Sequence, residues 1–338
     1  MRRTAALMAL VIAVAACGRS AGSDARTIGS EEGLARNQVA GTDLTRATVD
    51  LSDIIFDTFD GGSIRLTEAS DAEVTALRDA IAPIDEPSYE ANPDWLGPTD
   101  LVIGMVDSTG QAWAWPHRIL NLHEIVNDAI DGVPVLISYC PLCRSGVVYN
   151  RRVPVGDTTK TLSFGNTSAL YENDLVMVDR QTNTFWWQVR GLGIVGELAG
   201  VELPVLASRT TTWQRWSAEH DNTLVLTRES GGHLYDNDPF ASYAEFLDTG
   251  RFPFPVSERA ADDTRLAAST LVVVVTVDGD TFAVATTGEA TTVDVEGVTV
   301  RIDGAGGGDA LLGDAPYPSR STFWFAAVAA FPDITVVK

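Results

Sequence analysis

Residues 131–150 read DGVPVLISYCPLCRSGVVYN and set the pattern for the rest of the chain. Asp131-Gly132 is a turn signal, and the apolar run from Val133 to Tyr139 that follows it is typical of a buried strand. After Cys143, the residues from Gly146 to Arg151 resume an extended pattern. This stretch therefore predicts two strands joined by the tight turn Cys140-Pro-Leu-Cys143.

Strand patterns dominate the whole sequence, and helical patterns are few. Residues 101–106 and 111–115 are separated by Asp-Ser-Thr-Gly and predict a hairpin. Apolar residues recur at helical spacing over residues 71–82, where Ser70 fits an N-cap, and a second short helix is expected over residues 119–127. Further strands are expected at residues 162–165, 175–178, 185–189 and 224–227. The mixture predicts an α+β fold, predominantly β, in a barrel-like or roll-like domain.

Two loose internal echoes indicate a duplicated architecture. Leu101-Val-Ile-Gly104 and Asp131-Gly-Val-Pro-Val135 recur as Leu271-Val-Val-Val274 and Glu296-Gly-Val-Thr-Val300. A second echo relates Trp213 and its neighbours to Phe325 and its neighbours. We therefore expect two unequal halves, residues 47–230 and residues 231–338. The later copy of the echoes, from Leu271 onward, contains no cysteine and no histidine, so the function is expected in the first copy, between Trp113 and Arg190.

The N-terminus resembles a bacterial lipoprotein signal. Two arginines precede an apolar run that is too short to span a bilayer, and small residues lead to Cys17. In such signals the cysteine is lipidated and becomes the first mature residue. We therefore expect a signal peptide over residues 1–16 and a lipidated flexible tether over residues 17–46. The alternative is an ordinary secretory signal cut nearby. The lipid would attach the protein to a membrane of the cell envelope, outside the cytoplasm.

The composition excludes some classes of function. The formal net charge is −22, with a pI near 4.4, and no basic patch offsets it. A chain this acidic repels phosphate backbones, so nucleic acid is not an expected partner. Gly191-Leu-Gly-Ile-Val-Gly196 lacks the strand–turn–helix context of a dinucleotide site, so no nucleotide cofactor is expected. Protein partners and substrates are not indicated.

The two cysteines of the tight turn are the leading candidates for chemistry. Their strand–turn–strand setting lacks the helix N-terminus that lowers a thiol pKa in thioredoxin-like motifs, and it suits a metal-binding turn better. Such a turn gives only two ligands. His123 is the expected third ligand, Glu124 is expected to ligate directly or to orient the imidazole, and His117 is a secondary candidate. Cys140, Cys143 and histidine together suit zinc or copper, and thiol redox chemistry is an alternative at the same residues.

A second, noncatalytic function is kept open. If Cys17 is acylated, Cys140 and Cys143 can pair only with each other, and they would then staple a binding module as a disulfide. Its binding surface would be a tryptophan-lined cleft, and the residues expected to form it are Trp115, Asp179, Arg180 and Trp187.

Four motifs resemble a known prokaryotic family, the domain of unknown function 3179. The motifs are Arg118-Ile-Leu-Asn-Leu-His-Glu-Ile-Val-Asn-Asp128, Tyr139-Cys-Pro-Leu-Cys143, Asn173-Asp-Leu-Val-Met-Val-Asp-Arg180 and Phe323-Trp-Phe325. The resemblance extends from about Asp53 to the end of the chain. It implies no established activity, so the chemistry has to be argued from the residues.

Overall fold

The computed structural model describes residues 37–337, with gaps at residues 92, 229–234, 237 and 305. Most of its regular structure is strand, as expected for a predominantly β fold of the α+β class. The helices are short: α1 Asp71–Leu77, α2 His117–His123, α3 Trp213–Glu219, α4 Tyr243–Leu247, α5 Glu258–Ala261 and α6 Trp324–Ala330. Ser70 caps α1 in a full capping box with Glu73, but the helix ends five residues earlier than predicted. In the described part of the chain the sheets are open, so no barrel forms.

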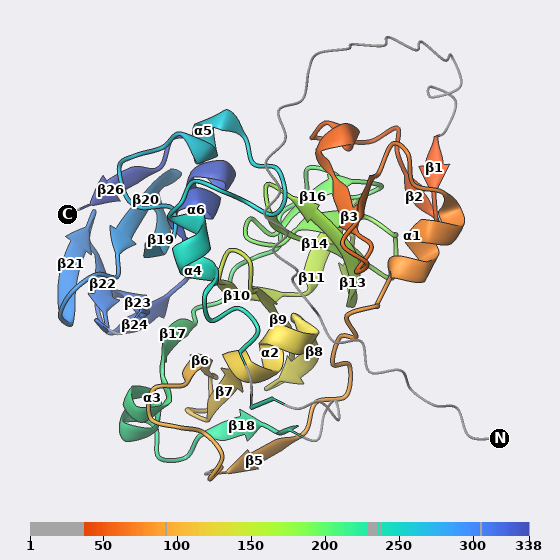
Figure 1. Cartoon of the computed structure of the whole chain (residues 1–338). Helices are drawn as coiled ribbons and strands as arrows, with labels where there is room; N and C mark the ends of the chain where they lie inside the picture. The colour runs from red at the N-terminus through yellow and green to blue at the C-terminus, as the bar shows by residue number, and fades with distance from the viewer. Residues whose placement is uncertain (1–36, 92, 229–234, 237, 305, 338) are drawn as a thin grey trace.

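A seven-stranded sheet combines strands from distant parts of the chain (Figure 1). Its order is β26-β20-β19-β25-β10-β9-β8. The bounds are β8 Ile125–Ile130, β9 Val133–Cys140, β10 Ser145–Asn150, β19 Leu271–Val277, β20 Asp280–Ala285, β25 Arg320–Phe323 and β26 Thr335–Val337. The predicted strand–turn–strand is β9 and β10, which pair antiparallel. The outer edge of β10 then pairs with β25 through Gly146 and Ser321.

A nine-stranded sheet repeats this arrangement with other strands. Its main order is β21-β22-β23-β17-β6-β7-β18-β5, and β24 pairs with β23. The bounds are β5 Tyr89–Ala91, β6 Leu101–Val106, β7 Ala112–Pro116, β17 Arg209–Thr212, β18 Leu224–Leu226, β21 Thr291–Val295, β22 Val298–Ile302, β23 Gly308–Leu312 and β24 Ala315–Tyr317. The predicted hairpin is β6 and β7. Here β23 pairs with β17 through Gly308 and Thr210.

The two sheets show that the fold is duplicated and that the copies are interlocked. β17-β6-β7-β18 of the first copy matches β25-β19-β20-β26 of the second, including the parallel pairing of the last strand. The three-stranded meander β8-β9-β10 extends the sheet of the second copy, and the meander β21-β22-β23 extends the sheet of the first. The turns also match, because Asp131-Gly132 and Glu296-Gly297 have positive φ at both positions, as in two-residue hairpins. Each copy therefore completes the sheet of the other.

The helices α3 and α6 occupy equivalent places in the two copies. Each begins directly after the strand that pairs across copies, with Trp213 and Trp324 as its first residue. The sequence echo had instead aligned Trp213 with Phe325. That alignment was wrong by one residue, because the aromatic run at residues 323–325 offers adjacent matches of similar quality.

The first copy is larger because a six-stranded sheet is built mostly from residues between β10 and β17. Its order is β16-β15-β14-β13-β3-β4. The bounds are β3 Ile55–Asp57, β4 Ser63–Arg65, β13 Phe164–Tyr171, β14 Asp174–Asp179, β15 Phe185–Trp187 and β16 Leu192–Val195. Two strand pairs accompany it, β1 Gln38–Val39 with β2 Thr42–Asp43 and β11 Arg152–Val155 with β12 Thr158–Thr161. Residues Val39 and Thr42 are fully buried, so the ordered body begins inside the stretch that was expected to be tether up to residue 46.

The cysteine turn lies in an apolar core where the inserted sheet meets the seven-stranded sheet. Cys140 and Cys143 pack in one hydrophobic cluster with Trp186, Phe323 and Phe325. The sulfur atoms are therefore surrounded by groups that give little solvation to a charge, and this environment sets the chemistry of the site.

Candidate metal-binding site

The cysteines sit on the tight turn between β9 and β10. Cys140 is the last residue of β9, and Cys143 lies in the turn before Ser145 begins β10. Both are free thiols, only 1% and 0% exposed, so the disulfide-stapled alternative is not the state observed. Arg144 closes the turn with φ +49°, a left-handed conformation that is unusual for a residue with a side chain.

Asp174 joins the two cysteines, and the sequence analysis did not single it out. The Cys143 thiol donates a hydrogen bond to Asp174 Oδ1 at 2.9 Å. The two sulfur atoms and an Asp174 carboxylate oxygen all lie within 4.8 Å of one another, and all three residues are buried. Asp174 is the first residue of β14, so the inserted sheet brings it to the turn. Its position as the polar start of an apolar strand was the available signal, but the motif drew attention to Asp179 and Arg180 instead.

The three groups of the cluster favour their protonated forms, because no positive charge in the described part of the chain lies beside them to stabilise the ionised forms. Burial raises the pKa of Asp174 to about 6, even though the thiols and the Val189 N–H, at 2.8 Å from Oδ2, donate hydrogen bonds to its carboxylate. Burial also raises the pKa of Cys140 and, more strongly, that of Cys143. Within the described residues, no basic side chain forms a hydrogen bond or ion pair with these three groups. A cation is the kind of ligand that would balance their ionised forms.

Glu124 lies near the cluster as a supporting group. The helix α2 ends one residue before it, because Glu124 takes a left-handed conformation with φ 59° and Ile125 begins β8. The helix predicted over residues 119–127 therefore begins two residues earlier and ends four residues earlier than expected. Asn166 Nδ2 donates to the Glu124 carboxylate at 2.6 Å. Burial, together with the negative charge of Asp174, raises the pKa of Glu124 to about 8.

His123 is not brought together with the cysteines. Its Nδ1 lies 2.7 Å from the carbonyl oxygen of Ala82, and its Nε2 lies 2.9 Å from the Tyr235 hydroxyl. It is absent from the group of potential ligands formed by Cys140, Cys143 and Asp174. The expectation that His123 is the third ligand is therefore corrected. Both of its ring nitrogens already contact oxygen atoms, one of Ala82 in the loop after α1 and one of Tyr235.

His117 is also outside the cluster. It is buried at the start of α2, its ring packs 4.4 Å from that of Tyr139, and its Nε2 has no hydrogen-bond partner among the described residues. Burial, helped by the positive charge of Arg144, lowers the pKa of His117 to about 3. The imidazole is therefore neutral at physiological pH.

The residues expected to line a cleft do not form one. Trp115 and Asp179 are fully buried, and Trp187 is 6% exposed within a hydrophobic core. The Asp179 carboxylate accepts hydrogen bonds from its own turn and from the Trp186 indole, which is a structural role. Arg180 lies on the surface in ion pairs with aspartates. This correction follows from burial, because both tryptophans were placed correctly in strands but face packed layers.

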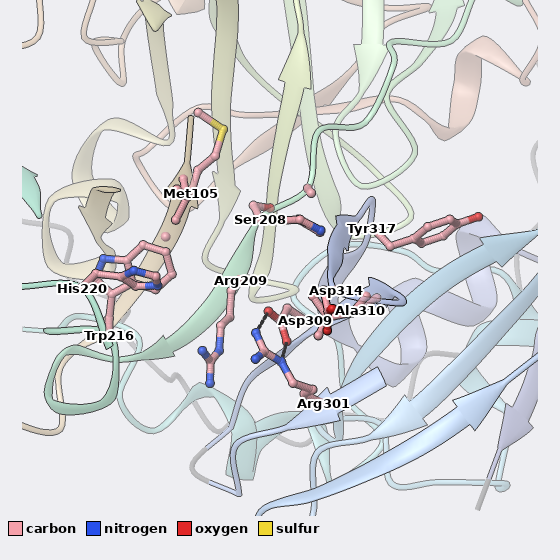
Figure 2. A pocket seen from close by; sticks show the side chains of 15 residues that line it. Met105, Ser208, Arg209, Trp216, His220, Arg301, Asp309, Ala310, Asp314 and Tyr317 are labelled. Carbon is pink, nitrogen blue, oxygen red and sulfur yellow. Dashed lines mark hydrogen bonds and ion pairs between the residues drawn. The ribbon is translucent and has the colours of Figure 1, made fainter. Parts of the chain in front are cut away.

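One cavity lies against the cysteine turn, and a larger one lies away from it. A cavity of about 60 Å³ lies against the cysteine turn and is lined by Tyr139, Pro141 and Arg144 among others. A larger one, of about 340 Å³, opens at the seam between the two copies (Figure 2). Both arginines that line it are ion-paired, Arg209 with Asp303 and Arg301 with Asp309. Neither cysteine lines either cavity.

The expected lipidation residue, Cys17, lies outside the described residues, as does the predicted signal peptide. Among the helices of the described chain, none has the length and apolar character needed to cross a membrane.

Comparison with known proteins agrees with the motifs quoted above. No curated protein and no solved structure matches the chain. One family model does match, over residues 78–302, which include the cysteine turn, Glu124 and Asp174. The chain therefore belongs to the family described as a protein of unknown function, DUF3179.

Proposed function

We propose that the protein binds one thiophilic metal ion through Cys140, Cys143 and Asp174. The observation that carries this proposal is the convergence of three buried ligand atoms within 4.8 Å of one another. The zinc–sulfur and zinc–oxygen bonds are about 2.3 and 2.0–2.2 Å long, so two such ligands stand about 3.5–3.8 Å apart on a tetrahedral ion. The side chains need only small movements to reach that spacing.

The metal would replace protons. The Cys143 thiol donates its proton to Asp174 across 2.9 Å. An ion bound between these two atoms would increase the distance between them by less than about 1 Å. Both thiols must lose their protons to ligate, so binding is expected to release protons and to tighten as the pH rises. Two thiolates suit zinc and copper alike, whereas the carboxylate oxygen favours zinc over Cu(I). Zinc is therefore the first candidate and copper the second.

The test is metal content by elemental analysis of protein purified without chelator. About one zinc or copper ion per chain is expected in the wild type, and a large loss in Cys143→Ser and in Asp174→Asn. His123→Gln is the matched control, and it should keep the ion because His123 lies outside the cluster. A reduced wild-type protein that neither carries nor takes up metal would overturn the proposal.

A second candidate function, thiol–disulfide exchange, is favoured by one observation. Asp174 is placed to accept the Cys143 proton, which would give a thiolate able to attack a disulfide of another extracytoplasmic protein. The attacked disulfide would be reduced, and Cys140 would release it by closing a Cys140–Cys143 disulfide. The burial of both sulfurs disfavours this reaction, because attack requires access. Incubation of the reduced protein with a disulfide-bonded substrate, followed by counting of free thiols, distinguishes the two functions.

We also propose that the protein is held at the cell envelope by a lipid on Cys17. The support is the sequence alone, namely a basic start, a short apolar run and small residues before the cysteine. Cys17→Ser should move the protein from the membrane fraction to the soluble fraction. Incorporation of a radiolabelled fatty acid should be lost in the same variant.

A further inference from the structure

We propose that a small oxyanion binds beside Arg144, at the mouth of the cysteine site. The cavity of about 60 Å³ described above, here called the mouth cavity, has the cysteine turn as its floor. Pro141 and Arg144 come from the turn itself, and Tyr139 directly precedes Cys140. Tyr243 and Phe240 close it from the segment around α4. A molecule that occupies the cavity therefore contacts the turn that carries the thiols, although neither cysteine itself lines the cavity.

The mouth cavity contains hydrogen-bond donors that the protein does not use. The guanidinium of Arg144 packs over the Phe323 ring at 5.7 Å, but it forms no hydrogen bond or ion pair with a described residue. The hydroxyl of Tyr139, which is only 3% exposed as a residue, likewise donates to no described residue. Elsewhere in the described chain, partly buried arginines such as Arg209 and Arg151 have several acceptors. A guanidinium fork and a phenol hydroxyl are donors that suit an oxyanion.

The backbone holds Arg144 in place against a local preference. Its φ of +49° is a conformation that favours glycine. Residues with side chains persist in such conformations where the surrounding structure fixes them, and they cluster at functional sites. Glycine would make the same turn more easily, so the turn itself does not require an arginine at this position.

The carboxylate of Asp238 lines the same cavity, and removing its charge should have the opposite effect on anion binding to removing the charge of Arg144. The Asp238 carboxylate accepts hydrogen bonds from Asn121 Nδ2 at 3.1 Å and from the Phe240 N–H at 2.9 Å. It forms no ion pair with Arg144 in the described structure. Asp238 would repel a bound anion, so removing its charge should strengthen binding.

The size of the mouth cavity restricts the ligand. A volume of about 60 Å³ admits the charged group of a molecule but little more. The shared chemistry is an oxyanion, which the carboxylate of a small organic acid or a free phosphate could provide. The inference does not require that the cluster binds a metal.

The experiment measures binding of acetate and of inorganic phosphate to the whole soluble chain by calorimetry, with chloride as the ionic-strength control. Wild type should bind one of the two probes, and the preferred probe identifies the source of the oxyanion. Arg144→Gly should weaken binding at least tenfold while leaving the melting temperature equal or higher, because glycine suits φ +49°. Asp238→Asn should strengthen binding several-fold.

Two controls separate the alternatives. Glu296→Gly relaxes a turn residue with the same φ, 49°, and should leave anion binding unchanged. Arg152→Gln removes an exposed positive charge and should also leave it unchanged. The proposal is overturned if neither probe binds wild type, or if Arg144→Gly binds as wild type does. Metal content is measured on the same samples, so loss of metal binding with anion binding intact would count against the metal site alone.

Discussion

At the scale of single residues, the site is a set of buried acids that share one apolar core. Cys140, Cys143 and Asp174 are in direct reach of one another, and Glu124 adds its carboxyl group nearby. The cysteine turn could be predicted from sequence because the two cysteines lie three positions apart, between two local strand patterns. Asp174 could not, because it reaches the turn only through the packing of a separate sheet.

The error at His123 has a similar cause. A helix that continued to residue 127 would have kept His123 on a helical face, but the left-handed Glu124 ends α2 and starts β8 at once. Nothing local in the sequence requires a glutamate to adopt φ 59°. The conformation belongs to the tertiary structure, where Asn166 holds the carboxyl group.

We expect Glu124→Gln to stabilise the metal-free protein at neutral and alkaline pH. The pKa of Glu124 is raised from 4.5 to about 8, so the folded state binds an extra proton between these values. Its contribution to stability is complete below pH 4.5 and is lost as the pH rises, at about 1.4 kcal/mol per pH unit, until about pH 8. Glutamine keeps an oxygen for Asn166 and does not ionise.

Urea unfolding in chelator at several pH values between 5 and 8.5 checks this expectation. The variant should show a shallower fall of unfolding free energy with pH than wild type. A residual slope is expected from Asp174, whose pKa is also raised. Parallel pH profiles for the two proteins would contradict the assignment of a buried, protonated Glu124.

Cys143→Ser and Phe325→Ala should differ in kind. The serine hydroxyl can still donate to Asp174, so we expect a loss of metal with a modest loss of stability, below about 2 kcal/mol. Phe325 is fully buried in α6, 5.0 Å from the ring of Phe252, and its truncation should cost about 3–5 kcal/mol. Melting temperature and metal content are measured on both. Equal destabilisation without any metal effect would reduce the cysteines to a packing role.

At the scale of elements, the hairpins were predictable and the pairing across copies was not. Asp131-Gly132 was predicted as a turn, and both it and its echo Glu296-Gly297 form hairpin turns. The contacts β10 with β25 and β17 with β23 join strands more than 90 residues apart and rest on one register pair each. The period of apolar residues indicates which face of a strand is buried, but it does not identify the strand from a distant part of the chain with which it pairs.

These cross-copy contacts predict unequal effects at two matched glycines. A methyl group on Gly308 would lie 2.2 Å from the backbone oxygen of Arg301, whereas one on Gly146 would meet the flexible end of Ile103 at 2.9 Å. We expect Gly308→Ala to destabilise strongly, because a paired backbone cannot move aside. Gly146→Ala should cost less, because overpacking against a flexible side chain typically costs about 1–3 kcal/mol. Thermal unfolding of both variants tests this order. A larger loss of stability for Gly146→Ala than for Gly308→Ala would contradict it.

At the scale of the whole molecule, the two copies cannot be separated without breaking both sheets. The seven-stranded sheet takes three strands from the first copy, and the nine-stranded sheet takes β21 to β24 from the second. Sequence analysis predicted two unequal, duplicated halves, but sequence echoes carry no information on how the strands of the two copies pair. The predicted boundary near residue 230 is therefore a division of the chain and not of the sheets.

We expect a fragment of residues 231–338 to remain unfolded when it is produced alone. It would carry β19 to β26 without the strands β10 and β17 that pair with its edges. Co-production with residues 37–230 should restore structure, as seen by circular dichroism of the copurified pair. A fragment that folds alone, with sharp proton chemical-shift dispersion, would contradict this interdependence.

The exchange of meanders has a consequence for the origin of the chain. Two identical subunits that each lent three strands to the other would form a symmetric dimer, and joining their genes end to end would give the order of strands seen here. In such a fusion the two turns, identical by symmetry at first, would be free to diverge. In this chain one turn carries Cys140 and Cys143 and faces the inserted sheet that supplies Asp174, whereas the equivalent connection between β22 and β23 is rich in glycine and has no thiol. Asymmetry of this kind lets a pseudo-symmetric ancestor carry a single site.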